Sequence, residues 1–386
     1  MRVAALASAP AALEQALAAR GVDRERAAAA AQGGVALRLL LDGLADEDVF
    51  ALFQSCRGAG VDCQTGEGWA VLAGTLARLA GLARPGEHAP LPPRLSEPLG
   101  RLLAARQDVP AEWRTARRGI PLDRPRILGI LNVTPDSFSD GGRLATVDDA
   151  VRAGAAMREA GADVLDVGGE STRPGASAPD EAEERRRVVP VVERLAREVG
   201  LPVSVDTRRA AVAAAALDAG AEIVNDVSAL SHDPGMAGLV AARGAGVVLM
   251  HMRGTPETMD EEALYDDVAI EVAAELAARR DAALAAGVGR DRVVLDPGLG
   301  FAKNAEQNYV IVNRLETLVA LGQPVLIGPS RKRFLGAATG RPVGERDAAT
   351  AAACVAARLR GAALFRVHDV AAAREALAVA DAVLAG

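Results

Sequence analysis

From residue 126 to the end of the chain, short apolar segments alternate with longer segments in which apolar residues recur every three or four positions. The short segments are typical of buried parallel strands, and the longer ones are typical of amphipathic helices. Eight such strand–helix units fit a (β/α)8 TIM barrel. An open doubly wound sheet is the alternative, less favoured because no Gly-x-Gly-x-x-Gly sequence follows the first strand. The eight apolar segments are RILGILNV, ADVLDVGG, LPVSVDT, AEIVNDVS, AGVVLMHM, RVVLDPG, QPVLIGPS and AALFRVHDV.

Residues 1–118 have a different pattern. The stretches VALRLLLDGL and WAVLAGT predict strands, and EDVFALFQSCRGAG between them predicts a helix that ends at glycine. The proline-rich LARLAGLARPGEHAPLPP that follows indicates a linker or an irregular cover. We therefore divide the chain into a small α/β extension of unknown role, residues 1–118, and a barrel, residues 119–386. Two strands and a helix are too few to bury a core alone, so the extension is expected to lean on the barrel or on a partner.

The composition excludes several classes of protein. A net charge of -7 and a pI of about 5.4 argue against a nucleic-acid-binding protein, which usually presents a basic face. No run approaches the roughly 18 apolar residues of a membrane span, and Glu14 interrupts the apolar N-terminus early enough to favour a helix over a signal peptide. Cys56, Cys63 and Cys354 lack metal-binding spacing and are too few for a disulfide framework, which fits the cytoplasm.

Lysine is almost absent from this chain. Of its 44 basic residues only Lys303 and Lys332 are lysines, and both follow predicted strands. Where an arginine-rich sequence keeps a lysine, the need for a compact, point-like ammonium group can be the reason. Chance is the alternative, but the shared position after strands favours the first interpretation.

Polar side chains stand at the end of every predicted strand. In a TIM barrel the carboxyl ends of the strands form the rim of the active site. A structural role, such as capping the next helix, is the alternative for any single position, notably Asp166, Glu170 and Asp226. Agreement among eight strands favours one shared site. In chain order these residues are Asn132; Asp166 and Glu170; Asp206; Asn225 and Asp226; His251 and Arg253; Asp296; Ser330, Arg331 and Lys332; and Arg366, His368 and Asp369.

One part of this set suits a flat heterocycle. Asp206, Asn225 and Asp296 supply two carboxylates and an amide for a ring with several N–H donors. A carboxylate can accept two parallel hydrogen bonds from an amino-pyrimidinone edge, as it does from a guanidinium. Lys332 can donate to a ring oxygen or nitrogen.

Another part suits a phosphate group. Asn132, Arg366 and His368 make a cationic, metal-capable corner for a phosphate or pyrophosphate with Mg²⁺. The sequence contains no Walker loop, no convincing Ser-His-Asp order and no His/Cys spacing for zinc.

The segments that carry these residues resemble the dihydropteroate synthase family of the folate pathway. They occur in the family's order over about residues 120–386, and the first two are the most specific. The resemblance implies a TIM barrel and an enzyme that condenses 6-hydroxymethyl-7,8-dihydropterin pyrophosphate with 4-aminobenzoate to give 7,8-dihydropteroate and pyrophosphate. The segments are GILNVTPDSFSDGG, DVGGESTRPGA, VSVDT, IVNDVSAL, LMHMRGTPETM, LDPGLGFAKN, GPSRKRFLG and RVHDV.

The resemblance also implies roles for individual residues, with Asn132 as the ligand of a Mg²⁺ cofactor and no clear role for Arg331. The residues expected to bind the pterin are Asp206, Asn225, Met250, Asp296, Phe301, Gly328 and Lys332. Those expected to bind the aminobenzoate and the pyrophosphate are Phe138, Thr172, Arg173, Pro174, Ser330, Arg366 and His368. The expected catalytic residues are Asp206, Lys332, Arg366 and His368.

Departures from the family's pattern are small within the barrel. Pro329, Leu299 and Ala302 stand where the family varies or carries other residues. The large departure is residues 1–118, which compact members lack, although longer members with a small N-terminal α/β extension exist. The resemblance also suggests a homodimer with the last helices as the contact, but these alanine-rich helices could simply pack on the barrel.

Two other functions fit part of this pattern. A methyltransferase that passes a methyl group from methyltetrahydrofolate to a corrinoid protein shares the barrel, but it does not need the SRK sequence or the TPDSFSDGG and STRPGA loops. A non-catalytic pterin-binding module would lack the pyrophosphate corner. Both are less favoured, because these segments are all present.

Overall fold

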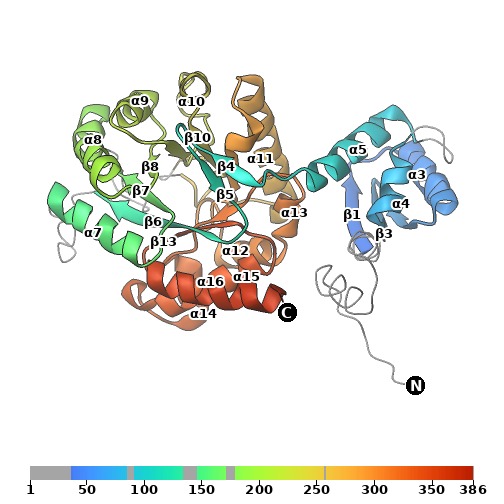
Figure 1. The fold of residues 1–386 in the computed structure, drawn as a ribbon. Coiled ribbons are helices and arrows are strands. Elements are labelled where there is room, and N and C mark those ends of the chain that lie inside the picture. Colours follow the sequence, from blue (N-terminus) through green and yellow to red (C-terminus); the bar gives the residue numbers. More distant parts are fainter. Residues whose placement is uncertain (1–35, 85–90, 134–145, 171–178, 256–257, 386) are drawn as a thin grey trace, which may run out of the picture. The chain divides into compact units, whose positions relative to one another are not determined.

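The chain divides into two compact units (Figure 1). One consists of Met1–Asp108 with Ala382–Gly386, and the other of Val109–Asp381, so residue 118 lies inside the second unit. No helix in the described part of the chain combines the length and the hydropathy that a membrane span requires. The computed structural model describes residues 36–84, 91–133, 146–170, 179–255 and 258–385.

The small unit contains a three-stranded antiparallel sheet in the order β1-β3-β2. The predicted strands β1 and β3 and the predicted helix α3 are present, and Gly60 ends α3 in the left-handed conformation. Strand β2 is not predicted, because its sequence DCQTG is polar and largely exposed. The elements are β1 (Ala36–Asp42), α3 (Asp46–Ala59), β2 (Asp62–Gly66), β3 (Trp69–Thr75), α4 (Leu76–Leu82) and α5 (Pro93–Gln107).

This unit has an apolar core of its own. Leu52 of α3, Leu72 of β3 and Leu79 of α4 are fully buried in it. Helix α4 occupies the start of the segment interpreted as a linker, and the Thr75 hydroxyl accepts a hydrogen bond from the main-chain N–H of Arg78 in its first turn. The described residues of this unit form three strands and three helices, more than the two strands and one helix predicted from the sequence, and the added α4 and α5 contribute to the core.

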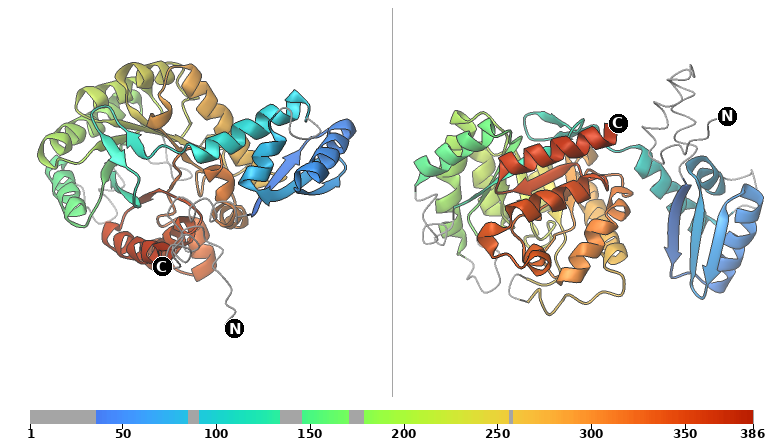
Figure 2. Two further views of the ribbon diagram at one scale, coloured as in Figure 1. Left: turned by 45° about the vertical axis from the view of Figure 1, so that its right-hand side comes forward. Right: turned by 90° about the horizontal axis from the view of Figure 1, so that it is seen from below.

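The larger unit is an eight-stranded parallel barrel surrounded by helices, which confirms the predicted TIM barrel (Figures 1 and 2). Its strands follow the order β11-β10-β9-β8-β7-β6-β13-β12, and a parallel bridge between Leu295 and Val325 closes the ring. The strands are β6 (Arg126–Asn132), β7 (Val164–Gly168), β8 (Val203–Asp206), β9 (Ile223–Asp226), β10 (Gly246–Met250), β11 (Val293–Asp296), β12 (Leu326–Ile327) and β13 (Leu364–Val367). The helices are α7 (Val147–Glu159), α8 (Glu181–Glu198), α9 (Ala210–Asp218), α10 (Met236–Arg243), α11 (Val268–Ala285), α12 (Ala305–Asn313), α13 (Glu316–Val319), α14 (Arg333–Thr339), α15 (Asp347–Arg358) and α16 (Val370–Ala385).

A short hairpin covers the amino end of the barrel. Its strands are β4 (Glu112–Arg114) and β5 (Gly119–Pro121), and Trp113 of β4 packs with the first residues of barrel strands, such as Val164. Trp113 is fully buried, and its indole N–H donates to the main-chain oxygen of Arg292 at 2.9 Å. The hairpin fills the end of the barrel opposite to the polar strand ends.

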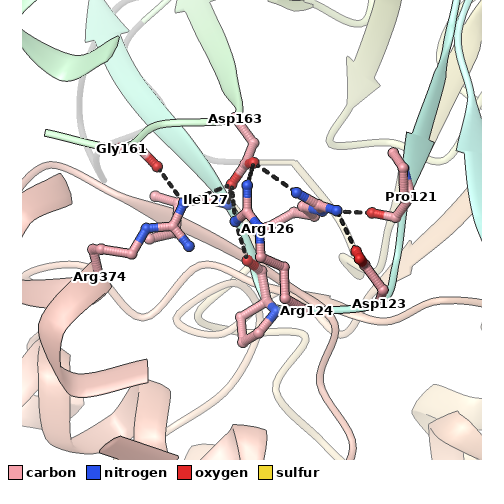
Figure 3. Close-up of polar contacts among 9 residues, drawn as sticks. Pro121, Asp123, Arg124, Arg126, Ile127, Gly161, Asp163 and Arg374 are labelled. Carbon is pink, nitrogen blue, oxygen red and sulfur yellow. Dashed lines mark hydrogen bonds and ion pairs between the residues drawn. The ribbon is translucent and has the colours of Figure 1, made fainter. Parts of the chain in front are cut away.

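An ion cluster at this end ties β6 to its neighbours (Figure 3). The Asp163 carboxylate accepts hydrogen bonds from Arg124 at 2.6 Å, from Arg126 at 3.1 Å and from the main-chain N–H of Ile127 at 2.9 Å. Arg374 of α16 also lies 3.5 Å from it. The Asp163 and Arg126 side chains are both buried, so each depends on the other to offset the loss of water.

Replacing Asp163 by alanine is expected to lower the free energy of unfolding by about 3 kcal/mol, because the buried Arg126 loses a charged partner. Urea denaturation followed by circular dichroism measures this change. The control is Asp218→Ala, which removes an exposed partner of Arg243 and should cost less than about 1 kcal/mol. Equally small losses in the two variants would contradict the structural role of Asp163.

Candidate active site

Four consecutive strands bring one residue each to the same level at the carboxyl end of the barrel. Asn132 of β6, Gly168 of β7, Asp206 of β8 and Asn225 of β9 are successive partners in the register of the sheet. A Cβ atom placed on Gly168 would lie 3.6 Å from Asp206 Oδ2 and 3.7 Å from Asn132 Oδ1. The Asp206 carboxylate and the Asn132 amide oxygen therefore both border the space next to Gly168, which has no side chain.

Arg366 of β13 links two carboxylates inside the barrel. Its Nε donates to Oδ2 of Asp166 at 2.6 Å, and its Nη2 donates to Oδ2 of Asp206 at 2.7 Å. The Asn225 amide donates to the same Asp166 carboxylate at 3.3 Å. Asp166 is fully buried and joins side chains from two other strands, Arg366 of β13 and Asn225 of β9. The sequence did not distinguish this role of Asp166 from the capping of a helix.

Two of the candidate carboxyls have pKa values close to neutrality. Burial raises the pKa of Asp206 to about 7 and that of Asp296 to about 6, although the positive charge of Arg366 opposes both changes. Asp296 also accepts a hydrogen bond from the main-chain N–H of Gly298 at 2.7 Å. A buried carboxylate that has lost its water gains from a ligand N–H donor, so this environment is typical of a binding site.

An ammonium group lies beside an apolar cluster on the same side of the barrel. The Lys332 Nζ is 3.9 Å from the centroid of the Phe301 ring. Phe301 and Met250 pack with Met259 and their neighbours. Burial, and then repulsion by Arg366, lower the pKa of Lys332 to about 8. The cluster offers an apolar surface next to a hydrogen-bond donor.

Ser330 and His368 contact each other at the ends of β12 and β13. The Ser330 Oγ lies 2.8 Å from Nδ1 of His368 and accepts a hydrogen bond from the main-chain N–H of His368 at 3.1 Å. Burial, and then the positive charges of Arg331 and Arg366, together lower the pKa of His368 to about 3. His368 is therefore neutral near pH 7, and the positive charge expected at this corner comes from Arg366.

Arg331 holds the turn that carries Ser330 and Lys332. Its φ angle is 58°, a left-handed conformation that is uncommon outside glycine. Its side chain makes two hydrogen bonds to the Asp347 carboxylate, at 2.8 and 2.9 Å. Its main-chain N–H donates to the Thr350 hydroxyl at 3.1 Å. Both partners belong to α15, so Arg331 fastens the turn to that helix.

Asn132 is the candidate magnesium ligand. In the described part of the chain no three His, Cys, Asp or Glu side chains are grouped as a metal site. A single amide oxygen nevertheless fits Mg²⁺, which keeps several water molecules and often binds through the phosphates of a substrate. A cavity of about 860 Å³ borders Asn132 and His368, but much of its lining belongs to α7 and the start of α16, and none of the polar pterin candidates lines it.

Of the remaining candidate residues, one lies in the described part of the chain and four do not. Gly328 is described, and a Cβ atom placed on it would lie 3.8 Å from the Cβ of Arg366. Four candidates lie outside the described residues: Phe138, Thr172, Arg173 and Pro174.

Comparisons with known proteins identify the family. The family described as "Pterin binding enzyme" matches residues 128–368. The dihydropteroate synthase of Mycobacterium leprae is 52% identical over 266 residues, which cover 67% of this chain and 93% of that protein. The chain belongs to the dihydropteroate synthase family. It is an enzyme, a transferase of folate biosynthesis, and the methyltransferase alternative is not favoured.

Two further relatives show how much of the chain each match covers. A Xanthomonas albilineans dihydropteroate synthase structure with 4-aminobenzoic acid has a TM-score of 0.67 and 49% identity, and the match covers 72% of this chain and 99% of that one. A probable bifunctional folylpolyglutamate synthase/dihydropteroate synthase of Halobacterium salinarum is 42% identical over 343 residues, which are 88% of this chain and 41% of that protein. A match of that length extends beyond the barrel into the small unit.

Proposed function

We propose that the chain condenses 6-hydroxymethyl-7,8-dihydropterin pyrophosphate with 4-aminobenzoate, giving 7,8-dihydropteroate and pyrophosphate. The observation that carries this proposal is that Asp206, Asn225, Asp296 and Lys332 stand at the carboxyl end of one barrel in a chain of this family. Two carboxylates, an amide and an ammonium match the donors and acceptors of an amino-pyrimidinone ring. The 4-aminobenzoic acid in the related Xanthomonas structure supports the second substrate.

The pterin would be bound by its polar edge and its apolar face. Asp206 and Asp296 accept hydrogen bonds from ring N–H groups, and Lys332 donates to a ring oxygen or nitrogen. Phe301 and Met250 contact the face of the ring. The full set that we assign to the pterin is Asp206, Asn225, Met250, Asp296, Phe301, Gly328 and Lys332.

The pyrophosphate would lie between Asn132, Arg366 and His368. The Asn132 amide would hold Mg²⁺, which when bound supplies positive charge to the departing pyrophosphate. Arg366 adds a permanent positive charge. The Ser330 hydroxyl accepts from the main-chain N–H of His368 and would donate its own proton to Nδ1, which leaves the Nε2–H of neutral His368 to donate to a phosphate oxygen.

In the reaction, the bond between the pterin methylene carbon and a pyrophosphate oxygen breaks, and the aminobenzoate nitrogen bonds to that carbon. The electron pair of the broken bond leaves with the pyrophosphate, and the nitrogen loses one proton to pyrophosphate or water. Positive charge on the methylene carbon spreads into the ring, where anionic Asp206 and Asp296 stabilise it. The residues that we assign to the aminobenzoate pocket are Ser330, Phe138, Thr172, Arg173 and Pro174.

We also propose that the enzyme is a cytoplasmic homodimer. Leu359, at the end of α15, and Val379 of α16 are exposed apolar residues on the last two helices, where copies could meet. Cys56, Cys63 and Cys354 are free thiols, which fits a reducing compartment. The sequence of residues 1–118 has no counterpart of the polar strand ends, so we assign this extension no part in the chemistry.

Incubating the purified chain with pterin pyrophosphate and radiolabelled aminobenzoate, with and without Mg²⁺, tests the proposed reaction. Labelled dihydropteroate should form only when pterin pyrophosphate and Mg²⁺ are both present. Methyl transfer from methyltetrahydrofolate to a corrinoid protein would instead support the methyltransferase. Pterin binding without any product would support a non-catalytic pterin-binding module.

A further inference from the structure

Lys303, the second of the two lysines, is not used by the proposed reaction. It follows the turn after β11 and is 5% exposed. Its Nζ contacts Nδ1 of His251 and the main-chain oxygen of Phe301, both at 2.9 Å. Two further main-chain oxygens, of Gly298 and His251, lie at 3.3 and 3.5 Å. Burial lowers the pKa of Lys303 to about 7. Of the four acceptors around its nitrogen, three are main-chain oxygens, so the side chain mainly holds backbone.

The backbone that Lys303 holds is strained. Between β11 and Lys303, three residues have left-handed φ angles: Gly298 at 66°, Gly300 at 79° and Ala302 at 48°. The last is not a glycine, so its conformation costs free energy that surrounding contacts must offset. Lys303 binds two carbonyl groups of this turn and one at the end of β10, and it therefore fixes the turn to the neighbouring strand.

The same turn builds one wall of the candidate pterin site. Phe301 lies between two of the left-handed residues, and its ring contacts the Lys332 ammonium. Gly298, at the start of the turn, donates its N–H to Asp296. Gly300 lies so close to Lys332 that a Cβ atom on it would be 3.0 Å from the lysine Cδ. A shift of the turn would therefore displace three groups assigned to the pterin.

His251, the side chain that contacts Lys303, is in turn held by residues outside the ring of strands. The Nε2 atom of His251 lies 3.0 Å from Glu275 of α11, and Arg253 donates to the other oxygen of that carboxylate at 3.0 Å. The Arg253 guanidinium also stacks over the Tyr265 ring at 4.0 Å. With Lys303 donating to Nδ1, His251 donates from Nε2 to Glu275. Continuous contacts therefore connect Glu275 of α11, through His251 and Lys303, to the turn.

We propose that Lys303 is a positioning residue for the pterin substrate, because its ammonium clamps the Gly298–Lys303 turn to the end of β10 and so sets the places of Phe301, Asp296 and Lys332. This inference rests on the proposed function. It also explains why an arginine-rich chain keeps a lysine here. Three main-chain oxygens and an imidazole nitrogen surround one nitrogen atom. A compact ammonium group suits this arrangement better than the planar guanidinium of arginine.

Lys303→Met, which replaces the unbranched stem of the side chain but removes its terminal nitrogen and donors, tests the proposal in the full chain. The KM for pterin pyrophosphate is expected to rise about 30-fold and kcat to fall, while the KM for aminobenzoate stays within about threefold, since the clamp acts on the pterin side of the site. The pterin dissociation constant, measured by calorimetry, should rise in parallel with the KM. A loss of stability alone would lower the melting temperature without this split between the two substrates.

Arg292→Met is the matched control. Arg292 also donates to main-chain oxygens, those of Thr115 and Gly244, but it does so at the amino end of the barrel. The Arg292→Met variant should have a lower melting temperature and unchanged KM values for both substrates. If Lys303→Met does not fold, Lys303→Gln, which keeps an amide donor, should fold and raise the pterin KM by about tenfold.

Two failures can be told apart. If the unchanged chain makes no dihydropteroate, the proposed function is wrong. If the unchanged chain is active and a folded Lys303→Met or Lys303→Gln variant binds the pterin normally, only the role of Lys303 is wrong.

Discussion

Replacing Arg366 by methionine is expected to lower kcat/KM for the pterin substrate about 10³-fold, which corresponds to about 4 kcal/mol. The guanidinium donates to Asp166 at 2.6 Å and to Asp206 at 2.7 Å. Without it, two buried carboxylates face each other, and their repulsion raises the pKa of Asp206 above its value of about 7. A protonated Asp206 no longer accepts a pair of hydrogen bonds from the ring. Steady-state kinetics at pH 7 measure the loss.

Two further variants control this experiment. Arg366→Lys keeps the charge but not the planar pair of donors, so it should recover only about tenfold of the lost activity. Arg333→Met removes an exposed arginine of α14 that pairs with Asp260, and kcat/KM should stay within about threefold. A folded Arg366→Met variant that retains more than about a tenth of the activity would show that the carboxylate pair does not depend on this arginine.

The pH profile of kcat/KM for the pterin substrate is expected to be bell-shaped. Burial raises the pKa of Asp296 to about 6 and that of Asp206 to about 7, so activity should fall as the pH drops and these acceptors are protonated. Burial lowers the pKa of Lys332 to about 8, so activity should fall again as the pH rises and the ammonium donor loses its charge. The profile reports the groups of the free enzyme.

The variant Lys332→Met is expected to lose the alkaline limb of this profile. At pH 7 its kcat/KM should be about 10²-fold lower, equivalent to about 2.7 kcal/mol, because a charged hydrogen bond to the ring is removed in a buried site. The acidic limb should persist, since Asp206 and Asp296 remain. An unchanged alkaline limb in Lys332→Met would assign that limb to another group.

Most of the barrel could be predicted from the sequence, because strands that are buried on both faces are almost continuously apolar. The segments RILGILNV and AGVVLMHM, for example, contain β6 and β10. The small unit was harder to predict. Strand β2 is short and polar, and α4 begins in an alanine- and leucine-rich stretch next to prolines that indicated a linker. Both elements depend on packing within the small unit, which local patterns do not contain.

The candidate site could be predicted only at the level of its strand ends. Asn132, Asp206 and Asn225 could be grouped because parallel strands end on one side of a barrel, and the register places them together. The roles of other residues depend on contacts between distant parts of the chain. Arg366 reaches Asp166 across the barrel from β13 to β7, and Lys303 binds carbonyl groups whose position no sequence pattern reveals.

The neutral state of His368 is another property that the sequence could not give. Histidine next to arginine at a strand end suggested a cationic pair, but burial and the neighbouring arginines lower its pKa to about 3. With the Ser330 hydroxyl donating to Nδ1, Nε2 is the nitrogen that can donate to a ligand. The degree of burial, which is the main cause of the low pKa, follows from the tertiary packing around the ends of β12 and β13 and not from the residue types.

The central claim is that the polar strand ends of the barrel bind the pterin ring, and a crystal structure of the chain with a bound pterin tests it most directly. The ring should lie at the carboxyl end of the barrel, with its N–H groups within about 3.2 Å of the Asp206 and Asp296 carboxylates, the Lys332 ammonium at its edge and Phe301 at its face. A ring that binds elsewhere, or that leaves both carboxylates without a contact, would contradict the claim.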